Sequence, residues 1–134
     1  MILVDTNVLL DLVTDDPFWA EWSQHQLRAA AATDELAINE AVFAELSVRY
    51  AVIEQVEALL ERVRATFVPT PQLALFLAGK AFQRYRAAGG IRTGVLPDFF
   101  LGAHAEVTNS LLVTRDTRRY RTYFPTIELI SPDD

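Results

Sequence analysis

The chain opens with "MILVDTNVLLDLV" (residues 1–13), where one acidic residue separates two apolar runs. Residues 2–4 have the length and continuous apolar character of a short strand that is buried on both faces. Asp5 follows at once, and burying an unpaired carboxylate beside a core strand costs several kcal/mol on general estimates. We therefore expect Asp5 either to end the strand and cap the next helix, or to meet a positive charge.

The rest of the chain alternates short apolar strands with amphipathic helices. Further strands are predicted at residues 36–39, 66–69, 110–114 and 127–130. Helices are predicted at residues 6–13, 17–32 (N-cap Asp16), 40–50 (N-cap Asn39), 52–65, 71–88 (ended by Gly89-Gly90) and from Asp98 onward. Strands separated by helices are typically parallel and covered on both faces. The predicted fold class is three-layer α/β/α with a short, mostly parallel central sheet, in a single domain spanning residues 1–134.

The composition excludes several kinds of protein. Hydrophobic residues make up 51% of the chain, which argues against disorder, and cysteine is absent. Disulfides, thiolate zinc sites and cysteine nucleophiles are therefore ruled out. No basic segment precedes the first apolar run, and no stretch reaches the ~18 apolar residues of a membrane span. We expect a soluble cytoplasmic protein without a signal peptide.

The formal charge of −6 is unevenly distributed along the chain. Residues 1–79 hold 4 basic and 12 acidic residues, whereas residues 80–134 hold 8 basic and 6 acidic ones. The basic residues of the second part are Lys80, Arg84, Arg86, Arg92, Arg115, Arg118, Arg119 and Arg121. A solvated helix face followed by a polar loop is the plain interpretation. These basic residues indicate a function only if they border an active site.

Four acidic residues are predicted to meet at one edge of the sheet. Ligands of open parallel sheets bind beyond the carboxyl ends of the strands. Asp5 follows the first strand and Asp116 follows the fourth. Asp98 starts a helix from which it can reach the same edge, and Glu45 lies in the helix after residues 36–39.

Each of these acids also has a purely structural interpretation. Asp98 follows a Leu-Pro pair and can act as an N-cap, and Asp116 can fix a turn through nearby amides. Glu45 can pair with Arg49 four residues later, although its apolar neighbours place it closer to a buried face. Glu40 is expected only to favour the dipole of its helix.

Taken together, the structural interpretations are weaker, because four carboxylates gathered without partners repel and raise one another's pKa values. A hard divalent cation such as Mg²⁺ or Mn²⁺ relieves that repulsion through oxygen ligands. Asp5 and Asp98 are the ligands we expect first, with Asp116 joining directly or through water. The chemistry that follows is hydrolysis of a phosphodiester by metal-activated water, with Glu45 as a further ligand or as the group that orients the water.

Four stretches of the chain, "VDTNVLLDLV", "FAEL", "LPDFFLGAHA" and "LLVTRDTRRYRTYFPTIELISP", resemble the PIN-domain family. The similarity covers essentially the whole chain and is greatest to the small bacterial toxin ribonucleases of VapC type. It implies a PIN-like α/β/α nuclease that cleaves RNA with Mg²⁺ or Mn²⁺ at an acidic quartet. Matched residue by residue, the quartet is Asp5, Glu45, Asp98 and Asp116. Glu40 is the alternative for the helical acid.

The resemblance also implies supporting residues and partners. Asn7 and Thr114 fall on positions that support the site through hydrogen bonds. Arg92, Arg115 and Arg118 are candidates for holding RNA phosphates. Proteins of this type form homodimers, sometimes within a larger toxin–antitoxin assembly. A small antitoxin silences them by placing basic or aromatic residues at the acidic site.

Two other functions can account for acids gathered at the edge of a sheet. A Mg²⁺-dependent phosphotransfer domain also gathers carboxylates at strand ends, but "DTN" (residues 5–7) lacks the D-x-D-x-T pattern of such hydrolases. A non-catalytic module could dock a basic peptide in its acidic groove. His25 is expected to be exposed and His104 to be hydrogen-bonded and partly buried, so neither suggests a zinc site. Trp19 and Trp22 are interpreted as core or dimer surface.

Overall fold

The computed structural model describes residues 1–92 and 94–133, and it is an α/β fold built on a five-stranded sheet. The strands are β1 (Ile2–Val4), β2 (Leu36–Ile38), β3 (Ala65–Phe67), β4 (Leu111–Val113) and β5 (Leu129–Ile130). They lie in the order β3-β2-β1-β4-β5, and each of the four pairings is parallel. The predicted fold class is confirmed.

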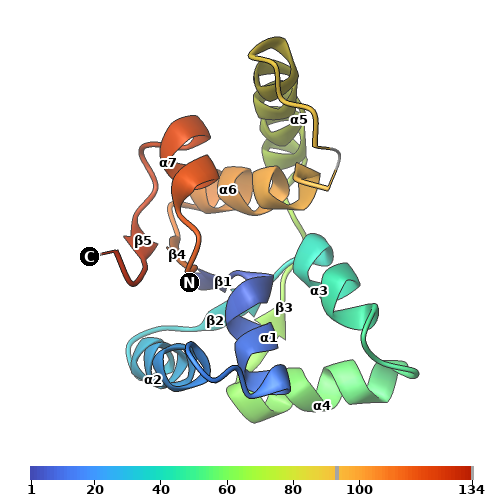
Figure 1. Ribbon diagram of the computed structural model, residues 1–134, viewed down its shortest axis with the longest axis vertical. Coiled ribbons are helices and arrows are strands. Elements are labelled where there is room, and N and C mark those ends of the chain that lie inside the picture. Colours follow the sequence, from blue (N-terminus) through green and yellow to red (C-terminus); the bar gives the residue numbers. More distant parts are fainter. Residues whose placement is uncertain (93, 134) are drawn as a thin grey trace.

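Helices cover both faces of this sheet. They are α1 (Thr6–Thr14), α2 (Ala20–Ala31), α3 (Glu40–Ser47), α4 (Ile53–Val63), α5 (Gln72–Ala87), α6 (Leu96–Thr108) and α7 (Arg118–Tyr123). Figure 1 shows α1, α2 and α4 on one side of the strands and α5, α6 and α7 on the other. The short α3 packs against both α1 and α6. None of the helices in the described part of the chain is long and apolar enough to cross a bilayer.

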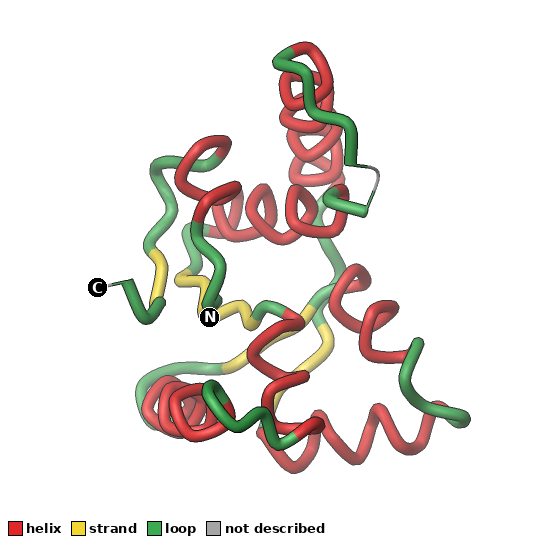
Figure 2. Tube along the Cα trace, in the orientation of Figure 1, coloured by secondary structure: helices red, strands yellow, loops and turns green. Residues whose placement is uncertain are grey.

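The strand order reverses beside β1, and this reversal positions the site. The chain runs outward from β1 to β2 and β3, and then crosses through α5 and α6 to β4 on the other side of β1 (Figure 2). Val4 is paired with Val113, and the backbone amide of Asp5 donates to the Val113 carbonyl at 2.9 Å. The segments that leave the carboxyl ends of β1 and β4 therefore start side by side, at the topological switch point where ligands bind in such sheets.

The strands differ in burial according to their place in the sheet. All residues of β1 and β2 are at most 1% exposed, which agrees with their continuous apolar sequence. The expectation of burial on both faces is wrong for β3, in which Thr66 and Phe67 are exposed. The reason is that β3 is an edge strand and β2 is its one neighbour in the sheet.

The start of α3 agrees with the prediction, and the start of α2 does not. Asn39 is the N-cap of α3 as expected, because its Oδ1 accepts from the amides of Ala41 and Val42. Asp16 accepts from the amides of Phe18 and Trp19, both at 2.9 Å, but this closes a turn and α2 begins only at Ala20. A separate turn capped by Asp16 precedes the helix, so the predicted helix start at residue 17 is three residues too early.

Further differences concern the ends of two helices and the presence of a helix that was not predicted from the sequence. Helix α3 stops at Ser47, three residues before the predicted end, and α6 starts at Leu96 instead of Asp98. The segment expected as a polar loop contains α7. Tyr120 and Phe124, spaced by one helical turn, are each 2% exposed. Their burial stabilises a helix in spite of three arginines within it.

The contact between α6 and α7 depends on a glycine. A Cβ added at Gly102 would collide with the ring of Phe124, which is buried, so α7 approaches α6 across a position without a side chain. Gly79, in α5, has open space at the same place.

We predict that Gly102→Ala destabilises the fold by about 1–3 kcal/mol, because the new methyl group overpacks the α6–α7 contact. The matched variant Gly79→Ala should instead be stabilised by roughly 0.5–1 kcal/mol, since alanine has the higher helix propensity. Urea unfolding of both variants measures these changes. An equal response of the two would contradict the packing described for Gly102.

Candidate active site

Asp5 is a buried carboxylate at the switch point. It is 6% exposed, and its Oδ2 accepts hydrogen bonds from Thr114 Oγ1 at 2.8 Å and from the Tyr120 hydroxyl at 2.7 Å. It precedes α1 but makes no side-chain cap. Burial raises the pKa of Asp5, while the two hydroxyl groups lower it and the charge of Glu45 raises it further. The first strand therefore ends in an acid held by hydroxyl groups, neither capping the helix nor paired with a cation.

Asp98 is the second acid, in the first turn of α6. Val95 occupies the N-cap position, so the interpretation of Asp98 as an N-cap is wrong. Its Oδ2 accepts from Arg119 Nη1 at 2.9 Å. Burial raises the pKa of Asp98 to about 7, with the charge of Asp5 pushing in the same direction and Arg119 opposing it.

Glu45 is the third acid, in α3, the helix that packs against both α1 and α6. Its Oε1 accepts from the Thr6 hydroxyl at 2.7 Å, so the partner in the described structure is Thr6 and not Arg49. The charge of Glu45 contributes to the raised pKa values of both Asp5 and Asp98. The residue is exposed, which corrects the expectation of a buried face. Three acids from three helices or strand ends thus act on one another.

Glu40 takes a different position from Glu45. Its Oε1 accepts from the backbone amide of Thr70 at 2.8 Å and from the Thr70 hydroxyl at 2.5 Å. Burial acts to raise the pKa of Glu40, but the hydrogen bonds from Thr70 outweigh it and the pKa is lowered. Glu40 therefore fastens the segment between β3 and α5, beyond the effect on its helix dipole that the sequence suggested.

Asp116 is the fourth acid, in the segment that follows β4. Its side chain is 52% exposed and lies 3.8 Å from Arg118 Nε, while its backbone amide donates to Thr114 Oγ1 at 3.2 Å. Among residues 1–92 and 94–133, no three histidine or acidic side chains are arranged to hold a metal ion as they stand. The structure thus brings Asp5, Glu45 and Asp98 into electrostatic contact and leaves the carboxylate of Asp116 facing solvent and Arg118.

The donor chemistry of these acids nevertheless fits a hard divalent cation. Carboxylate oxygens are the ligands that Mg²⁺ and Mn²⁺ prefer. The raised pKa values of Asp5 and Asp98 indicate that their negative charges are undercompensated in this arrangement. One carboxylate oxygen of Asp98 is bonded to Arg119, and one carboxylate oxygen of Glu45 is bonded to Thr6. A cation bound here would compete with these two contacts for the same oxygens.

Asn7 and Thr114 lie where supporting residues were expected. Thr114 is completely buried, and its hydroxyl donates to Asp5. Asn7 Nδ2 donates to Thr114 Oγ1 at 3.5 Å, and Asn7 Oδ1 accepts from the backbone amide of Arg115 at 3.4 Å. Asn7 therefore bridges α1 to the segment after β4 and helps to fix the hydroxyl group that holds Asp5.

Sequence reasoning missed three partners of the acids: Thr6, Arg119 and Tyr120. Thr6 and Arg119 carry no local signal, because their roles depend on helices distant in sequence. Tyr120 had one, since Tyr120, Tyr123 and Phe124 follow the i, i+3, i+4 spacing of a helix with one apolar face. That spacing would have predicted α7 and a buried phenol.

Arg115 has a structural partner. Its Nε and Nη2 donate to the two carboxylate oxygens of Asp11, each at 2.9 Å, and its guanidinium lies 5.4 Å from the centre of the Trp19 ring. Asp11 is 2% exposed and also accepts from Ser23 Oγ at 2.7 Å. The described structure commits Arg115 to this bidentate pair between α1 and the β4–α7 segment, which does not favour the predicted role in holding RNA.

Arg92 and Arg118 are both exposed and line one shallow pocket of about 310 Å³. Arg119, Thr122 and the rings of Tyr85 and Tyr123 complete its walls. Since Arg119 also contacts Asp98, this basic and aromatic pocket borders the acids. Three of the basic residues clustered in the second part of the chain, Arg92, Arg118 and Arg119, therefore lie beside the candidate site.

The remaining residues singled out from the sequence are two histidines and two tryptophans. His25 is exposed, as expected. His104 is completely buried instead of partly so; its Nδ1 lies 3.3 Å from Asn39 Nδ2, and its Nε2 has no partner in the described structure. Burial lowers the pKa of His104. Trp19 and Trp22 are half-buried and pack edge to face.

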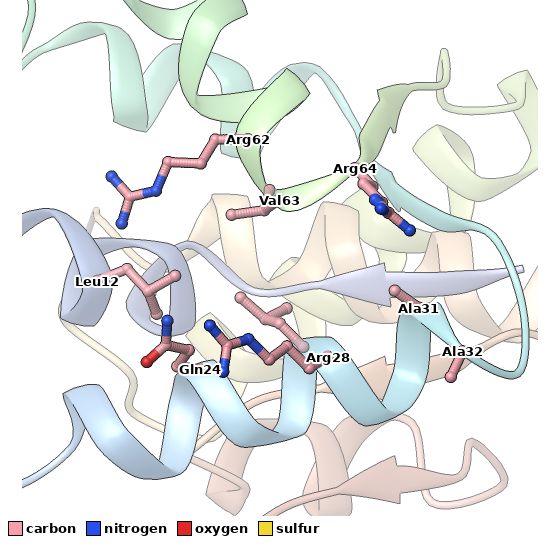
Figure 3. A pocket seen from close by; sticks show the side chains of 9 residues that line it. Leu12, Gln24, Arg28, Ala31, Ala32, Arg62, Val63 and Arg64 are labelled. Carbon is pink, nitrogen blue, oxygen red and sulfur yellow. The ribbon is translucent and has the colours of Figure 1, made fainter.

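A second pocket, of about 430 Å³, lies away from these acids between α1, α2 and the end of α4. Figure 3 shows Arg62 and Arg64 on either side of Val63, facing Leu12 and Arg28 across the pocket. Three of the four basic residues of the acidic first part of the chain gather here. The pocket shares no residue with the candidate active site.

The pair between Asp11 and Arg115 yields a stability prediction. Arg115→Met should lower the free energy of unfolding by about 3 kcal/mol, because it leaves a buried carboxylate without its cation. The control Arg118→Met removes an exposed charge from the same segment and should change stability by less than about 0.5 kcal/mol. Thermal and urea unfolding measure both. Similar small effects would show that Arg115 is not needed for folding.

The raised pKa of Asp98 yields a prediction on pH. The pKa of Asp98 is about 7 in the folded protein and about 4 in the unfolded chain, so the folded protein keeps the Asp98 proton to a higher pH. Its stabilising contribution is therefore complete below pH 4 and is lost as the pH rises to about 7. Asparagine does not ionise, so with EDTA present the Asp98→Asn variant should not show this loss of stability, which is on the order of 2 kcal/mol. At pH 8 the variant should therefore be more stable than the parent protein.

Glu40→Gln is the control for this experiment, because the lowered pKa of Glu40 gives the opposite sign. The stabilisation from Glu40 should be present above its unfolded pKa and be lost as the pH falls below it. Unfolding curves from pH 3 to 8 compare the two variants with the parent protein. An Asp98→Asn variant that is clearly less stable at pH 8 would contradict the electrostatics described for this site.

Comparison with known proteins agrees with this architecture. The PIN domain family model matches residues 2–125. The fold is similar to that in VapBC2 from Rickettsia felis bound to a promoter DNA fragment (TM-score 0.72, 22% identity, 98% of each chain covered). It is also similar to VapBC-1 from nontypeable Haemophilus influenzae (TM-score 0.69, 19% identity, 100% of each chain) and to a toxin–antitoxin complex from Klebsiella pneumoniae (TM-score 0.61, 21% identity, 98% of each chain). No curated protein matches the chain by sequence. With its model matched over nearly the whole length, this chain belongs to the PIN domain family.

Proposed function

We propose that this protein is a metal-dependent endoribonuclease and the toxin of a toxin–antitoxin pair. The observation that carries the proposal is the meeting of Asp5, Glu45 and Asp98 at the switch point of a PIN domain. The raised pKa values of Asp5 and Asp98, to which the charge of Glu45 contributes, favour a divalent cation. Membership of the family, and the toxin–antitoxin complex among the structures of the same fold, support the biological role.

The residues take the following roles in this proposal. Asp5 and Asp98 hold Mg²⁺ or Mn²⁺, Asp116 joins them directly or through water, and Glu45 orients the attacking water. The bound ion supplies an activated water and stabilises the charge on the leaving oxygen. Thr114 and Tyr120 keep Asp5 in place, since both hydroxyl groups are bonded to its Oδ2.

A protein partner is part of the same proposal. The contact between Arg119 and Asp98 shows that the acids accept a guanidinium, so a basic residue of an antitoxin can occupy the site in the same way. The three arginines of the pocket in Figure 3 have no ion-pair partner within the described chain and suit acidic side chains of that antitoxin. On α5, Leu73 and Phe76 are more than half exposed, which supports a homodimer.

The same contact favours a second candidate function, in which the acidic site only docks a basic peptide and cleaves nothing. Arg119 already fills part of the acidic site, as an arginine of a docked peptide would. The two functions differ in one property: docking needs no metal ion and leaves RNA intact.

A cleavage assay separates them. With Mg²⁺ the purified protein should cut labelled RNA, and excess EDTA should stop it. Asp5→Asn should lower the rate by about 100-fold or more, because it removes a charged ligand. Asp15→Asn is the matched control and should retain the rate, because Asp15 is an exposed aspartate in a left-handed turn that asparagine also adopts. Intact RNA in every lane would favour docking.

A further inference from the structure

Arg119 occupies two environments at once. Its Nη1 donates to Asp98 Oδ2 at 2.9 Å, and the residue also lines the pocket formed with Arg92, Tyr85 and Tyr123. Its side chain is 23% exposed, so it reaches from the acids toward solvent. The neighbouring Tyr120 fixes this part of α7, because its phenol is bonded to Asp5.

The contact with Asp98 competes with metal binding. A charge-assisted hydrogen bond of this length is one of the stronger polar contacts in proteins. A divalent ion and a guanidinium on the same carboxylate repel each other, so Asp98 cannot serve both fully. Asp98 is the one acidic partner of Arg119 among the described residues, and leaving it frees the guanidinium.

The freed guanidinium has a second place to bind. The pocket beside it holds Arg92 and Arg118 and two tyrosine rings, a combination that suits a phosphate flanked by a stacked base. Among the described residues, neither Arg92 nor Arg118 contacts Asp5 or Asp98, and Arg118 lies 3.8 Å from Asp116. Arg119 therefore both contacts Asp98 and lines this pocket.

We propose that Arg119 couples metal binding to RNA binding: it closes the Asp98 carboxylate in the metal-free protein, and turns to an RNA phosphate in the adjacent pocket when a divalent ion takes Asp98. The proposal rests on the metal site described under the proposed function. In this proposal α7 positions Arg119, which alternates between the carboxylate of Asp98 and a phosphate of the RNA. Metal and RNA should then bind more tightly together than separately.

Titration of the purified chain tests this coupling without measuring activity. Mg²⁺ affinity is measured by calorimetry, and RNA affinity by fluorescence anisotropy of a 2′-O-methyl oligoribonucleotide, which is not cleaved, with Mg²⁺ and with EDTA. Arg119→Gln should bind Mg²⁺ about tenfold more tightly, the size of one lost charge-assisted contact. The factor by which Mg²⁺ strengthens RNA binding should fall by the same amount.

Arg92→Gln is the matched control. It removes one positive charge from the same pocket but not from Asp98, so it should weaken RNA binding and leave both the Mg²⁺ affinity and the coupling factor unchanged. If the parent protein binds Mg²⁺ but Arg119→Gln binds it no more tightly, the role of Arg119 is refuted while the proposed metal site stands. If no variant binds Mg²⁺ or Mn²⁺, the proposed function fails, and the role of Arg119 fails with it.

Discussion

The burial and mutual repulsion of three acids, Asp5 after β1, Glu45 in α3 and Asp98 in α6, is the constraint around which this end of the molecule is arranged. Asp5 is nearly inaccessible, and the charges of Asp5, Glu45 and Asp98 act on one another. Each acid is offset by a partner from another element. Thr6 of α1 bonds to Glu45, whereas Thr114 and Tyr120 bond to Asp5 and Arg119 bonds to Asp98. The compensation is incomplete, since the pKa values of Asp5 and Asp98 stay raised.

Helix α7 joins the packing of the fold to the electrostatics of the site. Phe124, at its end, packs over Gly102 of α6, and this contact holds the short helix against α6. The same helix brings Tyr120 to Asp5 and Arg119 to Asp98. A shift of α7 would therefore alter the hydrogen bonds of two acids at once, although the helix contributes no acid itself.

The buried acids of this chain fall into two kinds. Asp11 is as inaccessible as Asp5, but it receives a bidentate arginine and a serine hydroxyl. Such a carboxylate has its charge matched inside the fold and needs no external ligand. Asp5 has hydroxyl groups alone as side-chain donors, which bond to the carboxylate without neutralising it. The nature of the partner, more than burial, marks Asp5 as a functional candidate.

The order of strands and helices other than α7, the parallel sheet and the position of Asp5 at its carboxyl edge followed from the sequence by itself, because apolar periodicity and capping are local properties. The same reasoning placed Asp5, Glu45, Asp98 and Asp116 near one another but could not orient their side chains. Only the tertiary structure placed the Asp116 carboxylate beside Arg118 and distinguished Glu45 from Glu40. It also assigned Arg115 to Asp11 and Arg119 to Asp98. Those pairings join residues from 21 to 104 positions apart, and which partner an ionised side chain meets at such separations depends on how the helices pack.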